Sequence, residues 1–328
     1  MKTWKAVVGL IAVAALGIGY ARWQARPLTV PELITLYKLP NSQFAEIDGV
    51  QVHYAVDGAK DLPCVVMLQG VNQNLRIYDG VVDAMKSDFH MLRIDTLTMG
   101  LTAPDPKMEY GADRNQRIVE ALTQRLGLTR CSFLTNGGGG RITYRYATAH
   151  PERVERVIFI NSAGAPHNYP PAPAPSLFDR AKGWISPRNA WADRLYSEFG
   201  SIPPSPEWVQ MTYDMNRRAG LDKEIKIAKV AASGDDAEKY LPNLRMPTLV
   251  LWGTTSHATP VSDVKVFEKA LSNSPSMTKL YEHAGHHPFL EYPKDVVRDM
   301  TAFLKGERDG ELRQPVQAET PTAGATVP

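Results

Sequence analysis

The sequence predicts an α/β protein with a mostly parallel sheet covered by helices on both faces. Short apolar runs recur along the chain, as at residues 64–68 and 154–160, and helical segments separate most of them. A strand that is apolar at every position is buried on both faces, which is typical of a parallel sheet between two helix layers. A long insertion rich in proline and aromatic residues then divides the predicted sheet into two halves.

The first half of the sheet begins with a hairpin, because Asp48-Gly49 separates two runs of strand-like sequence. Strands are predicted in this half at residues 44–47, 50–56, 64–68, 90–94, 132–134 and 154–160, and helices at 77–86 and 114–126. After the insertion the alternation resumes, with strands at 248–252 and 278–282 and helices at 261–271 and 293–305.

The insertion, residues 165–243, is predicted to be a helical cap. It opens with a proline-rich connection at 167–176 and continues with sequence that is helical in composition. Its aromatic residues are Phe178, Trp184, Trp191, Tyr196, Phe199, Trp208 and Tyr213. We expect most of these side chains to pack the small core of the cap and a few to line a cavity beneath it.

Residues 1–26 are predicted to be a membrane anchor or a signal segment. Two lysines precede an uncharged apolar run at 6–21, and Arg22 and Arg26 follow it. The run is at the short end of the roughly 17 to 25 residues that span a bilayer. Flanking aromatics and arginine favour an anchor, whereas Gly19-Tyr20-Ala21 has the spacing of a signal-peptidase site. Either alternative attaches the chain to a membrane or exports it, and the periplasmic or other extracytoplasmic side is favoured.

The composition fits one large domain rather than two independent cores. Of the 328 residues, 43% are hydrophobic and 22% are charged. The insertion divides the core into halves at 27–164 and 244–305. The segment 306–328 has no apolar periodicity and is predicted to be a disordered tail. A formal net charge of +2 lacks the basic excess of a nucleic-acid-binding protein. We expect no nucleic-acid partner and no cofactor.

The segment 131–141 has the layout of a nucleophile elbow, in which a strand runs through a sharp turn into a helix beginning near Arg141. Gly137 stands where the motif G-x-S-x-G places its serine. The elbow holds its central residue at positive φ, which only glycine adopts without strain. We therefore predict a positive φ at Gly137, an amide of Gly138 that points into a cavity beneath the cap, and no nucleophile.

Further motifs occur in a fixed order along the chain. They are Leu68-Gln69-Gly70, Arg93-Ile94-Asp95 with Gly100-Leu101-Thr102, His150-Pro151-Glu152-Arg153, and His283-Ala284-Gly285-His286 with Pro288 and Glu291. Together with the elbow, they resemble the α/β-hydrolase family over residues 44–305, in its capped esterase, epoxide-hydrolase and dehalogenase-like branch. The resemblance implies the α/β-hydrolase fold and a triad in the chain order nucleophile, acid, histidine.

The resemblance places the nucleophile at Gly137, the acid at Ser256 and the histidine at His286. In some family members the acid is displaced to a position that is Asn161 here. Only His286 therefore keeps a catalytic side chain. Loss of the carboxylate that orients a triad histidine costs about four orders of magnitude in turnover.

Backbone donors for a ligand oxygen do not depend on these side chains. The His-Gly pair that helps to form the oxyanion hole in the family is Gln69-Gly70 here, and the amides of Val71 and Gly138 remain. We predict that Gln69, Gly70, Val71, Asn136 and Gly138 contact a ligand.

Other polar residues near these motifs are not expected to replace the missing groups. Ser132 and Thr135 precede the elbow on its strand, where side chains point into the packing of the sheet. His257, His286 and His287 could suggest a metal site, but no acidic or cysteine residue stands at ligand spacing. We predict no metal.

Two functions are compatible with this sequence. The first is a catalytically degenerate hydrolase that binds a small apolar or ester-like ligand, or a protein partner, at the membrane; the family includes non-enzymatic receptors and adhesion proteins. The second is a hydrolase or lyase in which His286 acts as a general base without a covalent intermediate. A carboxylate near His286 would favour the second, and Asp95, Asp263 and Glu291 are the candidates. The missing groups favour the first.

The resemblance also makes the strands that begin at Cys64 and Cys131 neighbours in the sheet. Their Cα atoms should then be about 5 to 7 Å apart. On neighbouring parallel strands the Cβ atoms point side by side, which strains a bridge. We predict free, buried thiols.

Overall fold

The computed structural model describes residues 2–166, 174–231 and 236–315 and contains one eight-stranded sheet with the order β1-β2-β4-β3-β5-β6-β7-β8. Its strands are β1 Ser42–Ile47, β2 Val50–Asp57, β3 Cys64–Leu68, β4 His90–Ile94, β5 Cys131–Asn136, β6 Val154–Ile160, β7 Thr248–Gly253 and β8 Ser276–Tyr281. Strands β4, β3, β5, β6, β7 and β8 are parallel, and β1 and β2 are antiparallel. This confirms the predicted fold class.

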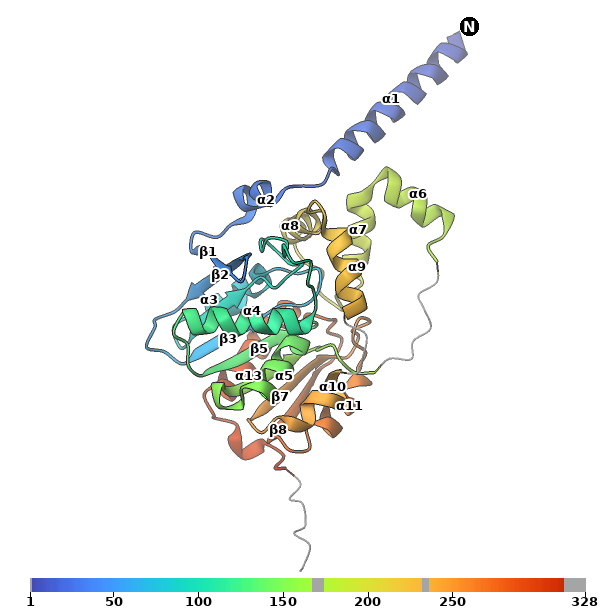
Figure 1. Cartoon of the computed structure of the whole chain (residues 1–328). Helices are drawn as coiled ribbons and strands as arrows, with labels where there is room; N and C mark the ends of the chain where they lie inside the picture. Colours follow the sequence, from blue (N-terminus) through green and yellow to red (C-terminus); the bar gives the residue numbers. More distant parts are fainter. Residues whose placement is uncertain (1, 167–173, 232–235, 316–328) are drawn as a thin grey trace, which may run out of the picture.

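Two layers of helices cover the sheet (Figure 1). One face packs against α4, α5, α10 and α11, and the other against α3, α12 and α13. Their bounds are α3 Asp79–Met85, α4 Ala112–Arg125, α5 Gly139–Ala149, α10 Asp236–Tyr240, α11 Asp263–Ala270, α12 Pro288–Glu291 and α13 Pro293–Leu304, and the short 3₁₀ segments are Leu75–Tyr78, Pro151–Arg153, Leu241–Asn243 and Asp309–Glu311. Strands β3, β5, β6 and β7 are almost fully buried, because both of their faces carry helices.

In the described residues of the insertion, the cap is formed by the helices α6 Leu177–Ile185, α7 Pro187–Tyr196, α8 Pro206–Asn216 and α9 Leu221–Ala231, whereas α10 packs against the sheet. Phe199 and Tyr213 are buried; Phe199 packs between Trp208 of the cap and His287 of the core, and Tyr213 is one of the aromatics that line a cavity. By contrast, Phe178 and Trp184 on α6 are exposed, so these two aromatics do not pack the core of the cap. Of the proline-rich connection, residues 167–173 are outside the described residues.

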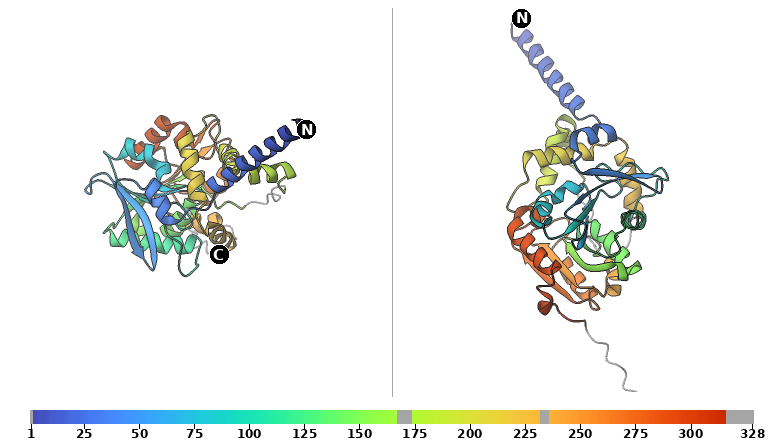
Figure 2. Two further views of the ribbon diagram at one scale, coloured as in Figure 1. Left: turned by 90° about the horizontal axis from the view of Figure 1, so that it is seen from above. Right: turned by 90° about the vertical axis from the view of Figure 1, so that its left-hand side faces the viewer.

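Helix α1, Lys2–Gln24, projects from the body of the molecule, and α2, Val30–Tyr37, leads back to it (Figures 1 and 2). The stretch Val7–Gln24 is long and apolar enough to cross a membrane, and none of it is buried in the protein. Its length and composition fit either a signal segment or a membrane anchor.

The C-terminal segment is more ordered than predicted. Residues 309–311 form a 3₁₀ turn, Leu312 is buried, and Arg313 pairs with Ser276 at the start of β8. Asp309 also forms an ion pair with Arg156 on β6. The expectation of a disordered tail from residue 306 is therefore wrong as far as residue 315, and residues 316–328 are outside the described residues.

The prediction of free thiols is also wrong, because Cys64 and Cys131 form a disulfide with a Cα–Cα distance of 4.6 Å. Strands β3 and β5 are parallel neighbours, as expected. However, each cysteine is the first residue of its strand, and the register of β5 with β6 is irregular between Cys131 and Phe133. At the first residues of β3 and β5 the side chains are therefore not restricted to the side-by-side geometry of a regular parallel pair. Their Cα–Cα distance is within the range for disulfides.

Candidate functional site

The elbow is formed as predicted, with Gly137 at a φ of 50° between β5 and α5. Its N–H donates to Ile160 O at 3.1 Å, and its carbonyl accepts from Ala163 N at 2.9 Å. A Cβ atom on Gly137 would be 3.0 Å from Nε2 of His286 and 3.2 Å from Cα of Gly70. The missing side chain would therefore point at the histidine and at the Gln69-Gly70 loop, as a nucleophile should.

His286 is held on its other side by hydroxyl groups. Its Nδ1 is 3.2 Å from Ser256 Oγ and 3.2 Å from Thr259 Oγ1. Thr259 Oγ1 donates its single proton to Asn161 O at 3.2 Å, so it accepts a hydrogen bond from Nδ1–H of His286. This assigns the tautomer from the hydrogen-bond network. Nε2 is then the unprotonated nitrogen, and it faces Gly137.

The His286 imidazole is buried, and this burial lowers its pKa well below the usual value; the neighbouring His287 adds a smaller effect in the same direction. In the part of the chain that the structure describes, no carboxylate forms an ion pair or hydrogen bond with His286. The ring is therefore neutral at neutral pH.

The candidate carboxylates have other partners. Asp95 lies 2.6 Å from His53 Nδ1 and accepts from the amides of Leu75 and Leu101. Glu291 Oε2 accepts from three consecutive cap amides, of which Ser201 N is the closest at 2.9 Å, and its Oε1 accepts from Gly285 N at 2.7 Å. Asp263 is buried in the first turn of α11. None of the three occupies the acid position.

The amides of Val71 and Gly138 are the best candidates for holding a ligand oxygen. Among the described residues, neither amide donates to a protein acceptor. Both residues line a pocket of about 120 Å³, together with Gln69 and Gly70. The side-chain amide of Gln69 is satisfied by the backbone when its nitrogen donates to Ile94 O and its oxygen accepts from Thr96 N.

Asn136 is not part of this pocket, although it was predicted to contact a ligand. It is fully buried, and its Nδ2 donates to Ile160 O at 3.0 Å and to His286 O at 3.1 Å. Asn136 therefore positions the histidine loop against the end of β5.

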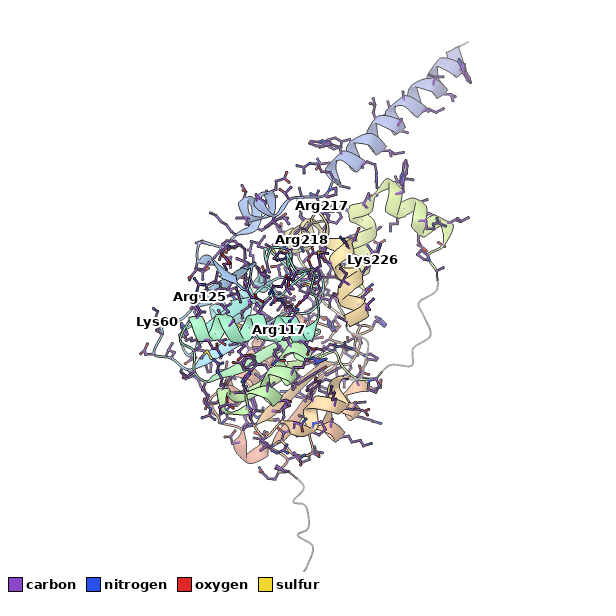
Figure 3. All side chains as sticks on the ribbon, in the orientation of Figure 1. Lys60, Arg117, Arg125, Arg217, Arg218 and Lys226 are labelled. Carbon is purple, nitrogen blue, oxygen red and sulfur yellow. A yellow bond between two sulfur atoms is a disulfide. The ribbon has the colours of Figure 1, made fainter. Side chains whose placement is uncertain are left out.

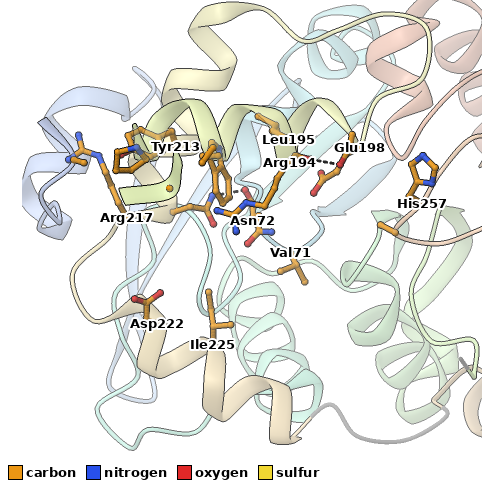
Figure 4. Close-up of a pocket in the computed structure, with 18 of the residues that line it drawn as sticks. Val71, Asn72, Arg194, Leu195, Glu198, Tyr213, Arg217, Asp222, Ile225 and His257 are labelled. Atoms are coloured by element: carbon orange, nitrogen blue, oxygen red, sulfur yellow. Dashed lines mark hydrogen bonds between the residues drawn. The ribbon is translucent and has the colours of Figure 1, made fainter. Parts of the chain in front are cut away.

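A larger cleft of about 820 Å³ separates the cap from the core (Figure 4). Val71 lines both this cleft and the smaller pocket, so the two are neighbours across one loop. The cleft has apolar walls at Trp191, Leu195 and Ile225, and charged or polar groups including Arg194, Glu198, Asn72 and His257. An amphiphilic molecule of moderate size matches such a mixed lining.

Two functional candidates had no signal in the sequence. Thr259, the hydrogen-bond partner of His286, belongs to no motif. Glu198, two residues after the end of α7, lines the cleft and places Oε2 3.2 Å from Nε2 of His287. The distance between Glu198 and the histidine loop depends on how the cap packs against the core, which the sequence does not indicate. Within the described ranges, no group of three or more His, Cys, Asp or Glu residues could hold a metal ion.

Comparison with known proteins identifies the family. Residues 63–293 match the model of the α/β hydrolase fold. Lipase 3 of a Moraxella species is 22% identical over 250 residues, which cover 74% of this chain and 77% of the lipase. Epoxide hydrolase 1 of Caenorhabditis elegans is 21% identical over 300 residues, covering 80% and 70% of the two chains.

Solved structures agree on the fold. A membrane phospholipase A, described as a bacterial virulence factor, has a TM-score of 0.70 at 21% identity and covers 94% of this chain and 99% of its own. An enol-lactonase from Burkholderia xenovorans has a TM-score of 0.65 at 20% identity, covering 80% and 100%. With the elbow, the strand order and the family match over most of its length, this chain belongs to the α/β hydrolase fold family.

Proposed function

We propose that this protein is a membrane-attached pseudo-hydrolase that binds a small apolar or ester-like ligand without turning it over. The observation that carries the proposal is the pairing of Gly137 with His286. The histidine lies where it would activate a nucleophile, but the residue facing Nε2 is a glycine. Its Nδ1 meets hydroxyl groups where a triad has a carboxylate.

The ligand class follows from what the site retains. Two free backbone amides suit a carbonyl or similar oxygen, and the adjoining cleft offers apolar walls for the rest of the molecule. The names of the relatives, which include lipases and a lactonase, support an ester or lactone. A protein partner at the cleft is the alternative occupant.

Attachment outside the cytoplasm is supported by two independent features. The apolar helix α1 is not covered by the protein, and the disulfide between β3 and β5 is typical of an oxidising compartment.

Binding without turnover can be tested directly on the full chain. We expect a panel of short-chain esters, lactones and epoxides to include compounds that bind, measured by calorimetry, while product formation stays at the buffer rate. Ile225→Trp should weaken binding because Ile225 lines the cleft, whereas Val230→Trp on the same helix is exposed and should not. Turnover by the unmodified chain would contradict the proposal.

A second function is favoured by the tautomer of His286. With Nδ1 donating to Thr259, the lone pair of Nε2 faces the elbow and could accept a proton from water or from an acidic substrate. In that case hydrolysis or elimination occurs in the unmodified chain and is lost in His286→Ala. No loss in that variant would assign the activity to another site.

A further inference from the structure

Helix α6 of the cap carries an apolar face that is largely exposed in the described part of the chain. Leu177, Phe178, Trp184 and Ile185 are 81%, 76%, 57% and 44% exposed, and no residue of α6 is buried. At helical spacing these residues and Ala181 occupy one arc of about 120°. Such a face is costly in water, because it leaves large side chains hydrated.

Charged residues border this face in a characteristic way. Arg180 and Lys182 flank the apolar arc on opposite sides, and Asp179 lies opposite its centre. The Lys182 ammonium forms an ion pair with Asp193 of α7, so Arg180 is the basic side chain offered here for contact with lipid phosphates. Long basic side chains at the edges of an apolar face extend their charges towards phosphate groups while their stems remain in the apolar layer. This is the pattern of helices that lie in the plane of a membrane surface.

Helix α6 lies beside the end of α1, so the membrane that its apolar face meets is the one that α1 enters. The Arg22 guanidinium lies 5.9 Å from the ring centre of Trp184, and the stacked rings of Tyr20 and Trp23 mark the same end of α1. Figures 1 and 2 show α1 projecting from the body with α6 near its base. Tyr and Trp are enriched at the depth of the lipid head groups. A bilayer that holds α1 therefore meets α6 at its surface.

We propose that α6 is an interfacial helix that docks the cap on the bilayer holding α1, so that the ligand enters the cleft from the lipid phase. Ala25, just after α1, and Gly183 of α6 both line the cleft. A second groove, of about 320 Å³, runs between the end of α1 and α7 and shares Ala25 and Pro187 with the cleft. The inference rests on the proposed membrane attachment and adds to it a second contact and a route of entry.

The test uses the full chain in vesicles of zwitterionic and anionic phospholipids. Phe178→Cys places a single reactive thiol on the apolar face for an environment-sensitive fluorophore, since both native cysteines are in the disulfide. Lys60→Cys is the matched control, because Lys60 is an exposed residue away from α6 (Figure 3). We expect lipids with a nitroxide near the head group to quench the probe at position 178 at least about twofold more than at 60, since interfacial helices lie about 5–10 Å deep.

Flotation of the same samples with the vesicles after an alkaline wash measures attachment through α1 separately. If the chain floats but the probe at 178 is quenched no more than at 60, docking of α6 is refuted while attachment stands. A blue-shifted probe that lipid nitroxides do not quench would mean that protein, such as a second copy of the chain, covers α6, which also refutes the proposal. A chain that does not float refutes both attachment and docking.

Discussion

Gly137 and His286 meet in the geometry of a nucleophile and its base, although one of them has no side chain. A Cβ atom added at Gly137 would lie 3.0 Å from Nε2 of His286 and would push the ring by a few tenths of an ångström. A larger residue at this position would therefore contact the histidine directly. Ser256 Oγ stands 3.2 Å from Nδ1, which is where a carboxylate would orient the ring. Two substitutions therefore separate this site from a complete triad.

Gly137→Ser with Ser256→Asp should create weak esterase activity, which the proposed function predicts to be absent from the parent. The serine occupies a left-handed conformation, so the variant should also lose about 1 to 3 kcal/mol of stability. Hydrolysis of an activated ester and thermal unfolding measure the two effects. Gly137→Ser by itself is the control, and it should be slower by up to about four orders of magnitude because no carboxylate orients and stabilises the imidazolium. A folded double variant without activity would show that the oxyanion donors are misplaced.

The pH dependence of His286 follows from its burial. Its pKa in the folded protein lies below the value of about 6.5 for an unfolded chain. Between these two values the unfolded state binds a proton that the folded state does not, so the stability from this group is complete above about pH 6.5 and falls as the pH drops towards the folded pKa, by up to about 1.4 kcal/mol per pH unit.

NMR titration of the His286 ring should give a midpoint below 6.5, and His286→Gln should flatten the acid side of the stability profile. A midpoint above 6.5 would reveal a carboxylate near the ring and would favour an enzyme.

The adjacent strands β3 and β5 connect the disulfide at one end to the site at the other. Cys64 and Cys131 begin these strands, and the Gln69-Gly70 loop and Gly137 follow their ends. The covalent link thus restrains the two strands that supply the oxyanion donors.

Removing the disulfide should lower stability substantially. The bridge closes a separation of 67 residues, for which the chain-entropy model gives about 4 kcal/mol. Urea unfolding of Cys64→Ser with Cys131→Ser against the oxidised parent measures the loss, and the same parent treated with reductant is the control. Thiol titration of the denatured, unreduced parent should find no free cysteine; two free thiols would contradict the bridge.

A buried carboxylate, that of Glu291, links the cap to the loop that carries the histidine. Glu291 accepts hydrogen bonds from the amides of Gly200, Ser201 and Ile202 in the cap and from Gly285 in the loop that carries His286. His286 N also donates to Glu198 O at 2.6 Å. We therefore expect a movement of this part of the cap to displace the loop that carries the histidine.

Glu291→Ala should uncouple these parts. Leaving several buried amides without an acceptor costs at least about 1–3 kcal/mol, and amide hydrogen exchange should accelerate around residues 198–202 and 283–287 more than elsewhere. Glu307→Ala, on an exposed turn, is the control and should leave exchange unchanged. Faster exchange spread evenly over the molecule would contradict a local coupling.

The sequence was sufficient to predict the strands of the sheet, the cap and the elbow, because each of these depends on a local pattern of residues. Strands 64–68, 90–94 and 154–160 begin and end where their apolar runs do, and Gly137 has the backbone angle that the turn requires. The family resemblance then located His286 and the backbone donors.

The tertiary structure decided what depends on distances between segments far apart in the chain. Thr259 as the partner of His286, the pair of Glu198 with His287, the disulfide and the exposed face of α6 each depend on how cap, loops and strand ends meet. Hydrophobic periodicity and secondary-structure propensity are properties of one segment at a time. They do not indicate which hydroxyl, carboxylate or thiol of one segment lies within about 3 Å of a group on another.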